Sequence, residues 1–303
     1  MFSFNRGEFL ENCLESVKKC ATNYKVFLID DNSDDAYTKR VIERHFSTFE
    51  QLDPCQDSSE FKTGGLYANM RFALSYTKDK NIRYALFLQD DMQLVRTIRP
   101  EDIYLADQYF NATPNSAELH TCFMKRFFYA KDSLHTRLNR NSTAYIRGDS
   151  FEGFSGFSAV GLFHVERFFK LFGDLRQGEY INNAFARENS IKMGFSAYPF
   201  MMWLPYPISH RGKERNIPLQ LIERLGGCGF YPYSIFEKNK TEEFLTRDIT
   251  QFPLAENWLS PKNNAPKTKS WSFAGGISNL RSRDGLRGYL ASFLDWSRKT
   301  FDI

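Results

Sequence analysis

Two short acidic clusters contain the residues best suited to carry chemistry. Asp30-Asp31-Asn32-Ser33-Asp34 closes one apolar run and Asp90-Asp91 closes another, 60 residues further on. A carboxylate at a strand end can accept hydrogen bonds from a nucleobase or a ribose hydroxyl. Two adjacent carboxylates repel each other unless a cation compensates, and hard oxygen ligands suit Mg²⁺ or Mn²⁺, which usually keep positions open for substrate phosphates. Together the clusters favour a site for a divalent metal and a nucleotide diphosphate. Either cluster alone could instead be a solvated acidic turn, and the side chains of the first could cap the next helix.

The apolar pattern predicts the elements that would position these clusters. Helices are expected at Gly7–Cys20 and Tyr37–Phe46 and from Gly64-Gly65 onward, and strands at Phe2–Phe4, Lys25–Asp30, Tyr84–Leu88 and 191–199. Such alternation predicts an α/β fold with a mostly parallel sheet and helices on both faces. Ligands of these sheets bind beyond the carboxyl ends of the strands, where both acidic clusters lie.

Composition excludes several other classes of protein. The 303 residues are 42% apolar and 25% charged, so the chain folds. A net charge of +4 is too small to indicate a nucleic-acid partner. The five cysteines never form a Cys-x-x-Cys pair, which argues against a disulfide framework and a zinc site and indicates a reducing compartment. With no apolar run of about 18 residues and no secretory signal in Met1–Arg6, a cytoplasmic location is expected.

Three segments resemble the family 2 glycosyltransferases of the Rossmann-like GT-A fold. Phe4-Asn5-Arg6 with the helix that follows resembles the opening of the family, 29–33 its nucleotide-binding Asp-Asp-x-Ser, and 88–91 its metal-binding Asp-x-Asp-Asp. The resemblance covers residues 1 to 215, and Leu88 departs from it at the first acidic position. It implies a metal ligand at Asp91 and nucleotide-binding residues Asn5, Arg6, Asp30, Asp31, Ser33 and Asp90.

Later segments extend the resemblance. Residues 161–169 resemble the helix after the acceptor-side strand of the family. The segment 173–187 resembles the one that carries the catalytic carboxylate, where Glu179-Tyr180 replaces the usual Glu-Asp. Glu179 is therefore the candidate base, with Asp149, Glu152 and Asp174 in reserve. His210 is a candidate metal ligand, and Lys213 in the same basic segment could neutralise a leaving diphosphate, although a solvated basic loop explains both equally well.

The implied organisation is a GT-A nucleotide-sugar-binding and catalytic domain at 1–215 and a C-terminal extension at 216–303. That extension holds a linker near 260–270 and an amphipathic helix from Leu286. This helix could pack on the catalytic domain, pair with another subunit in a homo-oligomer, or bind peripherally to the inner face of the membrane.

The implied activity is metal-dependent, inverting transfer from a nucleotide-diphosphate sugar, with a UDP-sugar favoured, to a saccharide or glycolipid hydroxyl in surface polysaccharide biosynthesis. Aromatic side chains available for stacking on sugar rings are Phe151, Phe154, Phe157, Tyr198 and Trp203. One alternative is a nucleotidyltransferase acting on a sugar phosphate, although Asn5-Arg6-Gly7 offers only one glycine of the glycine-rich loop expected there. The other alternative is a non-catalytic carbohydrate-binding relative. Leu88 and Tyr180 favour it, because each stands where the family has an acidic residue.

Overall fold

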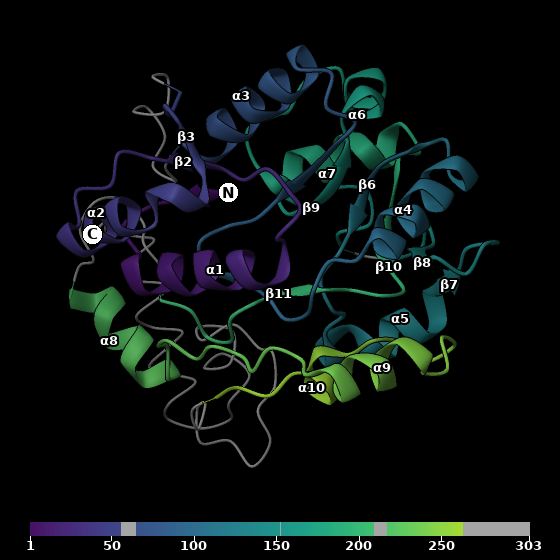
Figure 1. Cartoon of the computed structure of the whole chain (residues 1–303). Coiled ribbons are helices and arrows are strands. Elements are labelled where there is room, and N and C mark those ends of the chain that lie inside the picture. The colour runs from purple at the N-terminus through teal and green to yellow at the C-terminus, as the bar shows by residue number, and fades with distance from the viewer. Residues whose placement is uncertain (56–64, 152, 209–216, 263–303) are drawn as a thin grey trace.

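A computed structural model describes residues 1–55, 65–151, 153–208 and 217–262 (Figure 1). At the amino-terminal end, β1 (Phe2–Ser3), β2 (Phe27–Asp30) and β3 (Glu50–Leu52) form a parallel sheet. Helix α1 (Gly7–Cys20) has the bounds that its apolar spacing predicts, and it packs on α2 (Ala36–Arg44) and on β5 (Met92–Leu94). The short turn η1 (Phe46–Thr48) follows α2.

A second, six-stranded sheet forms the centre of the molecule. Its order is β4-β9-β6-β10-β8-β7, and of its neighbouring pairs only β6 and β10 run parallel. The strands are β4 (Tyr84–Phe87), β6 (Ser116–His120), β7 (Thr136–Leu138), β8 (Ala144–Arg147), β9 (Gly161–His164) and β10 (Lys192–Ser196). A two-stranded antiparallel sheet joins β5 (Met92–Leu94) to β11 (Met201–Trp203).

The α/β class with a mixed sheet is confirmed, but most strand pairs of the described residues are antiparallel rather than parallel. The reason is that β9 runs between β4 and β6 in the opposite direction to both. The segment 161–169, predicted as a helix, accordingly starts as a strand and becomes α6 (Val165–Phe172) only afterwards. Apolar periodicity identifies a buried strand but contains no signal for its direction.

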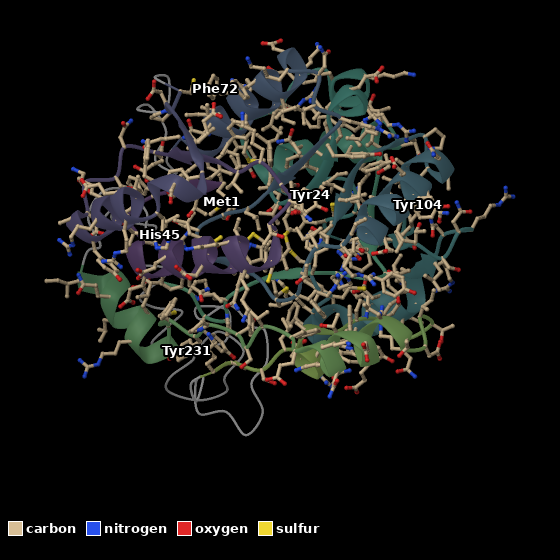
Figure 2. All side chains as sticks on the ribbon, viewed as in Figure 1. Met1, Tyr24, His45, Phe72, Tyr104 and Tyr231 are labelled. Carbon is tan, nitrogen blue, oxygen red and sulfur yellow. The ribbon has the colours of Figure 1, made fainter. Side chains whose placement is uncertain are left out.

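Helices cover both faces of the central sheet, as predicted. Neighbouring residues of β9 point to opposite sides: Phe163 packs in a cluster with α3 (Leu66–Asp79), α6 and α7 (Glu179–Glu188), whereas Leu162 packs against α4 (Pro100–Ala112). Side chains fill the space between these layers (Figure 2). Beside the sheet lie the short elements η3 (Arg126–Phe128) and α5 (Tyr129–His135).

The described part of the predicted C-terminal extension holds α8 (Ile217–Gly226), α9 (Lys238–Thr246) and α10 (Ala255–Trp258). Phe244 of α9 and Ala255 of α10 belong to the same buried cluster as Phe9 of α1. Most of the predicted linker and the predicted terminal helix lie outside the described residues. None of the described helices has the length and apolar character needed to cross a membrane.

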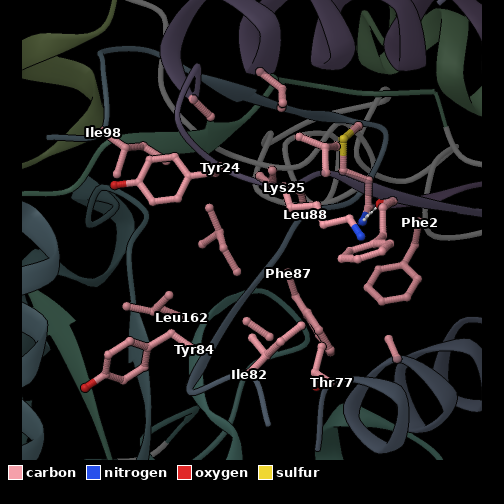
Figure 3. A pocket seen from close by; sticks show the side chains of 18 of the residues that line it. Phe2, Tyr24, Lys25, Thr77, Ile82, Tyr84, Phe87, Leu88, Ile98 and Leu162 are labelled. Atoms are coloured by element: carbon pink, nitrogen blue, oxygen red, sulfur yellow. Dashed lines mark hydrogen bonds between the residues drawn. The ribbon is translucent and has the colours of Figure 1, made fainter. Parts of the chain in front are cut away.

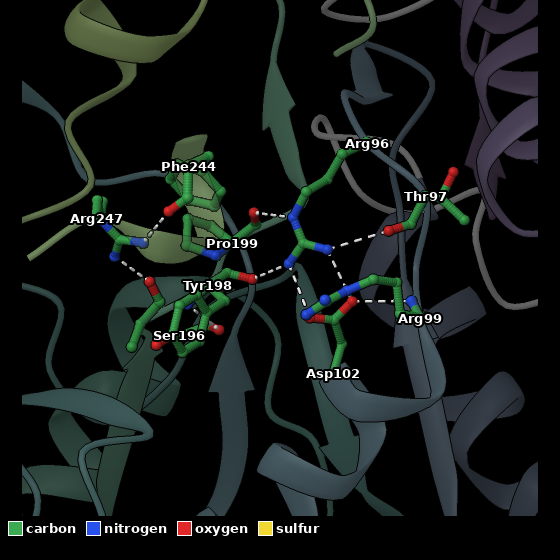
Figure 4. Close-up of polar contacts among 10 residues, drawn as sticks. Arg96, Thr97, Arg99, Asp102, Ser196, Tyr198, Pro199, Phe244 and Arg247 are labelled. Carbon is green, nitrogen blue, oxygen red and sulfur yellow. Dashed lines mark hydrogen bonds and ion pairs between the residues drawn. The ribbon is translucent and has the colours of Figure 1, made fainter. Parts of the chain in front are cut away.

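A buried ion pair joins α4 to the segment before β11. Arg96 is fully buried, and its guanidinium donates to both carboxylate oxygens of Asp102, at 2.7 and 2.9 Å (Figure 4). The same guanidinium also donates to the carbonyl oxygens of Tyr198 and Pro199. Because Tyr198 and Pro199 lie two to three residues before β11, the pair joins the start of α4 to the segment that leads into the strand paired with β5.

An apolar cavity of about 540 Å³ lies beside β1, at the amino-terminal ends of β2 and β4 (Figure 3). Among its lining residues are Phe27 and Ile29 of β2 and Tyr84 and Phe87 of β4. Strands β2 and β4 thus continue beyond the two residues of β1, and the cavity occupies the space between them. None of Asp30, Asp31, Asp90 and Asp91 lines it.

Candidate active site

The segment Ser3–Arg6 lies between the two acidic clusters and contacts both. The Ser3 hydroxyl donates to Oδ1 of Asp30 at 2.6 Å, and the next peptide N–H, that of Phe4, donates to Oδ2 of Asp90 at 3.0 Å. This happens because β1 pairs with β2 on one side and bridges to Gln89 on the other. The structure therefore brings the two clusters to one place, at the carboxyl ends of the strands.

The first cluster is held by hydrogen bonds within its own loop. Asp30 accepts from the backbone N–H of Ser33 at 2.8 Å and from its hydroxyl at 2.7 Å. Asn5 donates its backbone N–H to the Ser33 hydroxyl at 2.9 Å, and its side-chain oxygen accepts from the N–H of Asp34 at 2.9 Å. Asn5 itself has a φ of 50°, a left-handed conformation that asparagine tolerates better than most residues. It is Asp35, outside the predicted set, that caps α2 by accepting from Thr38.

Asp31 connects this loop to the start of α3. Its carboxylate accepts from the N–H of Gly65 at 2.7 Å and from the side-chain amide of Asn69 at 2.9 Å. A carboxylate has about four lone-pair sites, so Asp31 retains capacity for a ligand donor. Helix α3 thereby becomes one wall of the site.

Arg6 neutralises the second cluster. Its guanidinium forms ion pairs with Asp90 and with Asp91, the latter at 2.9 Å, and it also donates to the carbonyl of Ile208 at 3.2 Å. Burial raises the pKa of Asp90 to about 6, although the charge of Arg6 works in the opposite direction. Burial also disfavours the charged form of Arg6, but the two carboxylates outweigh it and raise the pKa of the guanidinium. Arg6 was expected to bind the nucleotide, and it lies here on the carboxylates.

The second cluster fits a divalent cation that completes its coordination with substrate. Asp91 is 8% exposed, and its Oδ1 is buried without a hydrogen-bond partner among the described residues. The described ranges hold no group of three His, Cys, Asp or Glu side chains that could bind a metal. Mg²⁺ and similar ions are commonly held by one or two carboxylates plus phosphates, so Asp90 and Asp91 are a sufficient protein contribution. Leu88, at the departure from the family motif, is buried in the core.

Glu179, which is half-buried, lies in a second group of carboxyls together with the buried Glu118. It begins α7, and its Oε1 accepts the N–H of Ala159 at 3.2 Å. Burial raises the pKa of Glu179. Glu118 of β6 is 1% exposed, and its Oε2 accepts the N–H of Ser158 at 2.9 Å. Burial, together with the charge of Glu179, raises the pKa of Glu118 well above its usual value.

The start of α3 lies near both groups of carboxyls. Burial raises the pKa of Tyr67, and the charges of Glu179 and Glu118 raise it further. Tyr67 lies two residues before Asn69, which holds Asp31. The first turn of α3 thus holds Asp31 through Asn69 and lies near the two glutamates through Tyr67.

Aromatic and basic side chains form the remaining part of the site region. The ring centroids of Trp203 and His120 lie 5.6 Å apart. The Nζ atom of Lys125 lies 4.6 Å from the centroid of the Trp203 ring. Burial lowers the pKa of His120 to about 3, so its ring is neutral. Burial also lowers the pKa of Lys125. Of the aromatic residues expected to stack on sugars, Phe151 and Phe157 are buried in the interior, which corrects that expectation.

Several predicted residues do not join these groups. Asp149 pairs with Lys192, and Asp174 lies 3.4 Å from Arg71, with both carboxylates exposed. Tyr180 is 80% exposed. His210, Lys213 and Glu152 lie outside the described residues.

The sequence interpretation missed Glu118, Ser158 and Tyr67. A signal existed for Glu118, because it is the one acidic residue in the five-residue strand Ser116–His120, all of which is buried. A buried carboxyl in a strand requires a partner or a function. Ser158 and Tyr67 have no comparable local signal.

Two solved structures resemble the chain. The crystal structure of S. aureus TarS has 14% identity and a TM-score of 0.40, with 80% of this chain and 42% of the TarS chain covered, so the chain spans less than half of TarS. The crystal structure of core-mannan synthase A (CmsA/Ktr4) from Aspergillus fumigatus, in its Mn/GDP form, has 11% identity and a TM-score of 0.35, with 73% and 81% covered. No curated protein matches the sequence.

The model of Glycosyl transferase family 2 matches residues 1–169. The match includes both acidic clusters and the segment Ser3–Arg6, and it stops before Glu179. It confirms the resemblance inferred from the sequence motifs and the class of enzyme which that resemblance implies. Since the match spans more than half of the 303 residues, the chain belongs to glycosyl transferase family 2.

Proposed function

We propose that this chain transfers a sugar from a nucleotide-diphosphate sugar to a hydroxyl of a saccharide or glycolipid, with inversion at the anomeric carbon and with a bound Mn²⁺ or Mg²⁺. A UDP-sugar is the first donor to test, and surface polysaccharide synthesis is the proposed setting. The observation that carries the proposal is the placement of Ser3–Arg6, which contacts Asp30 on one side and Asp90 and Asp91 on the other.

The two acidic clusters are suited to the two ends of a nucleotide diphosphate. The carboxylates of Asp30 and Asp31 can accept hydrogen bonds from base or ribose donors. Asp90 and Asp91 would hold the metal, whose chemistry when bound is to stabilise negative charge on the diphosphate. If a cation took the place of Arg6 at these carboxylates, the guanidinium could bind a phosphate through its planar donors.

Glu179 is proposed as the base. In a single displacement, the acceptor oxygen forms a bond to the anomeric carbon while the bond from that carbon to the diphosphate oxygen breaks, and the nucleotide diphosphate leaves with the electron pair. The acceptor hydroxyl gives its proton to the Glu179 carboxylate. The raised pKa of Glu179, caused by its burial, brings the group closer to the acidity that suits a base working near neutral pH.

The acceptor side is proposed to include Trp203. Its ring is only partly buried, and a flat aromatic face provides a stacking surface for a sugar. Lys125 and His120 lie against this ring, which fixes its orientation.

Thermal unfolding of the whole chain tests the proposal. UDP, GDP, dTDP and CMP are each added with Mn²⁺ and with EDTA, since a ligand that binds the native state raises its melting temperature. At 100 times the dissociation constant the gain is about 2.7 kcal/mol. We expect one nucleotide to stabilise the protein in Mn²⁺ only, and Asp91→Asn to abolish that gain.

The matched control is Asp53→Asn, which removes an exposed carboxylate and should leave the gain intact. If no nucleotide raises the melting temperature, the proposal is wrong. Nucleotide binding without transfer to any saccharide, in either metal, would instead favour the non-catalytic relative, which the exposed Tyr180 at the family's acidic position already suggests.

A further inference from the structure

Glu118 is set apart from the other carboxyls of the site by its surroundings. It is 1% exposed, and no described lysine or arginine forms an ion pair with it. Its Oε2 accepts the Ser158 N–H, whereas its Oε1 is buried and has no hydrogen-bond partner among the residues the structure describes. An ionised carboxylate in such a place would bear a large desolvation cost with one donor to offset it.

The backbone is arranged to admit this side chain. Opposite the Lys192–Met193 step of β10, β6 advances by two residues, from Ser116 to Glu118, which is a bulge of the kind that redirects a side chain. Oε1 of Glu118 lies beside Gly161, only 3.2 Å from where a Cβ would stand, and Gly161 has a φ of 140°. A side chain at residue 161 would therefore crowd this oxygen, and glycine leaves the space that it occupies.

Ser158 joins Glu118 to Glu179. Its backbone N–H donates to Glu118, and its hydroxyl donates to Glu179, a contact that lowers the pKa of Glu179 against the larger effect of burial. The next residue, Ala159, donates its N–H to Glu179 at 3.2 Å. One short segment thus binds both carboxyls, and Glu118 holds it at Ser158.

We propose that Glu118 is an uncharged carboxylic acid that positions Glu179, by anchoring the Ser158–Ala159 segment through its carbonyl oxygen Oε2 while its proton stays on Oε1. This inference rests on the proposed function only for calling Glu179 the base. Glu118 is a positioning residue, because it acts through Ser158 and not on substrate. The pair then has a single negative charge, located on Glu179.

The pKa directions agree with this arrangement, since burial and the Glu179 charge raise the pKa of Glu118 and so favour its protonated form. The titratable and charged groups that face the pair come from several elements and are Tyr67 of α3, Tyr109 of α4, and Cys122 and Lys125 after β6. Among these, Lys125 is the cation, and it acts on Glu179.

The first test compares the folding equilibria of the wild type and Glu118→Gln by urea unfolding from pH 5 to 9. Above pH 4.5, the ordinary pKa of a glutamate, the unfolded wild type releases the Glu118 proton while the folded protein keeps it. The wild-type folding constant should therefore fall relative to that of Glu118→Gln, by up to about tenfold per pH unit. The control is Glu188→Gln, an exposed change on α7 that keeps Glu118. Its folding constant should change with pH in parallel with that of the wild type. Parallel pH profiles for the wild type and Glu118→Gln would overturn the proposal.

The second test follows the Glu179 carboxyl by ¹³C NMR, identified by the signal that Glu179→Gln removes. Glutamine keeps the acceptor for Ser158 and is as uncharged as the proposed acid, so Glu179 should titrate in Glu118→Gln as in the wild type. A lower pKa in that variant would show that Glu118 had been charged. Glu118→Ala releases the Ser158–Ala159 segment, so Glu179 loses the two hydrogen bonds that lower its pKa, and in that variant the pKa of Glu179 should rise above its wild-type value. An unchanged value in Glu118→Ala would refute the positioning role.

Neither readout requires sugar transfer. A chain without transferase activity would contradict the proposed function and still leave both tests decisive for Glu118. If Glu118→Ala does not fold, Glu118→Gln still decides the charge of Glu118 through its stability profile, and Glu118→Met, which removes the acceptor for Ser158 and keeps most of the volume, takes the place of Glu118→Ala in the Glu179 titration.

Discussion

Replacing Arg6 by methionine tests the electrostatics of the second acidic cluster. The change removes the guanidinium that pairs with Asp90 and Asp91 and keeps most of the side-chain volume. Two adjacent carboxylates that are 2% and 8% exposed would then have no paired cation among the described residues. Breaking a buried pair by removing one partner costs about 3–5 kcal/mol. We expect the lower end, about 3 kcal/mol, because the Arg6 side chain is itself 16% exposed.

The assay is thermal unfolding in EDTA and in Mn²⁺. For a chain of this size about 3 kcal/mol corresponds to a loss of roughly 6–12 °C in EDTA. Mn²⁺ should raise the melting temperature of Arg6→Met more than that of the wild type, since in the variant the ion replaces the missing charge without displacing an arginine. The control is Arg44→Met, which breaks a solvent-exposed pair with Glu11 and should cost at most about 1 kcal/mol in either condition. Equal losses in the two variants, or equal responses to Mn²⁺ in Arg6→Met and the wild type, would refute the reasoning.

Three further outcomes are expected. Asp102→Ala leaves the fully buried Arg96 without its carboxylate and should lower the free energy of unfolding by about 3–5 kcal/mol in urea titration. Glu50→Ala removes the exposed pair with Lys25 and should lower it by less than about 1 kcal/mol. Similar losses in the two variants would contradict this prediction. His120 is neutral when folded and its pKa is about 3, so below pH 6.5 only the unfolded chain gains its proton, and acid should destabilise the wild type more steeply than His120→Phe in urea titrations from pH 7 to 4; identical slopes would show that His120 is accessible. Gly194→Ala would place a Cβ 2.5 Å from the ring of Tyr109 and should cost about 1–3 kcal/mol, and a neutral result in thermal unfolding would mean that this contact is loose.

Local sequence patterns predicted the elements that carry the first half of the site. Helix Gly7–Cys20 was predicted to the residue because its apolar side chains repeat at helical spacing over four turns. The two acidic clusters were located because apolar runs end at them, and β1 brings both runs to one edge. Family motifs then supplied roles that no spacing could supply.

Local sequence patterns could not predict contacts between segments that are distant in the chain. Arg6 meets Asp91 across 85 residues, so its pairing with the metal candidates could not be read from its position in the opening motif. The direction of β9 depends on its neighbours in the sheet. Glu118 acquires its environment from Ser158, 40 residues later, and the loop that supplies Ser158 has no regular pattern of its own.

Diffraction at the manganese edge, from crystals of the whole chain grown with Mn²⁺ and UDP, tests the proposed metal and nucleotide site most directly. We expect one anomalous peak, from an ion that contacts both the Asp91 carboxylate and the phosphates of UDP, with the nucleoside extending towards Asp30 and Asp31. A nucleotide bound with no ion at Asp91, or bound away from the segment Ser3–Arg6, would contradict it.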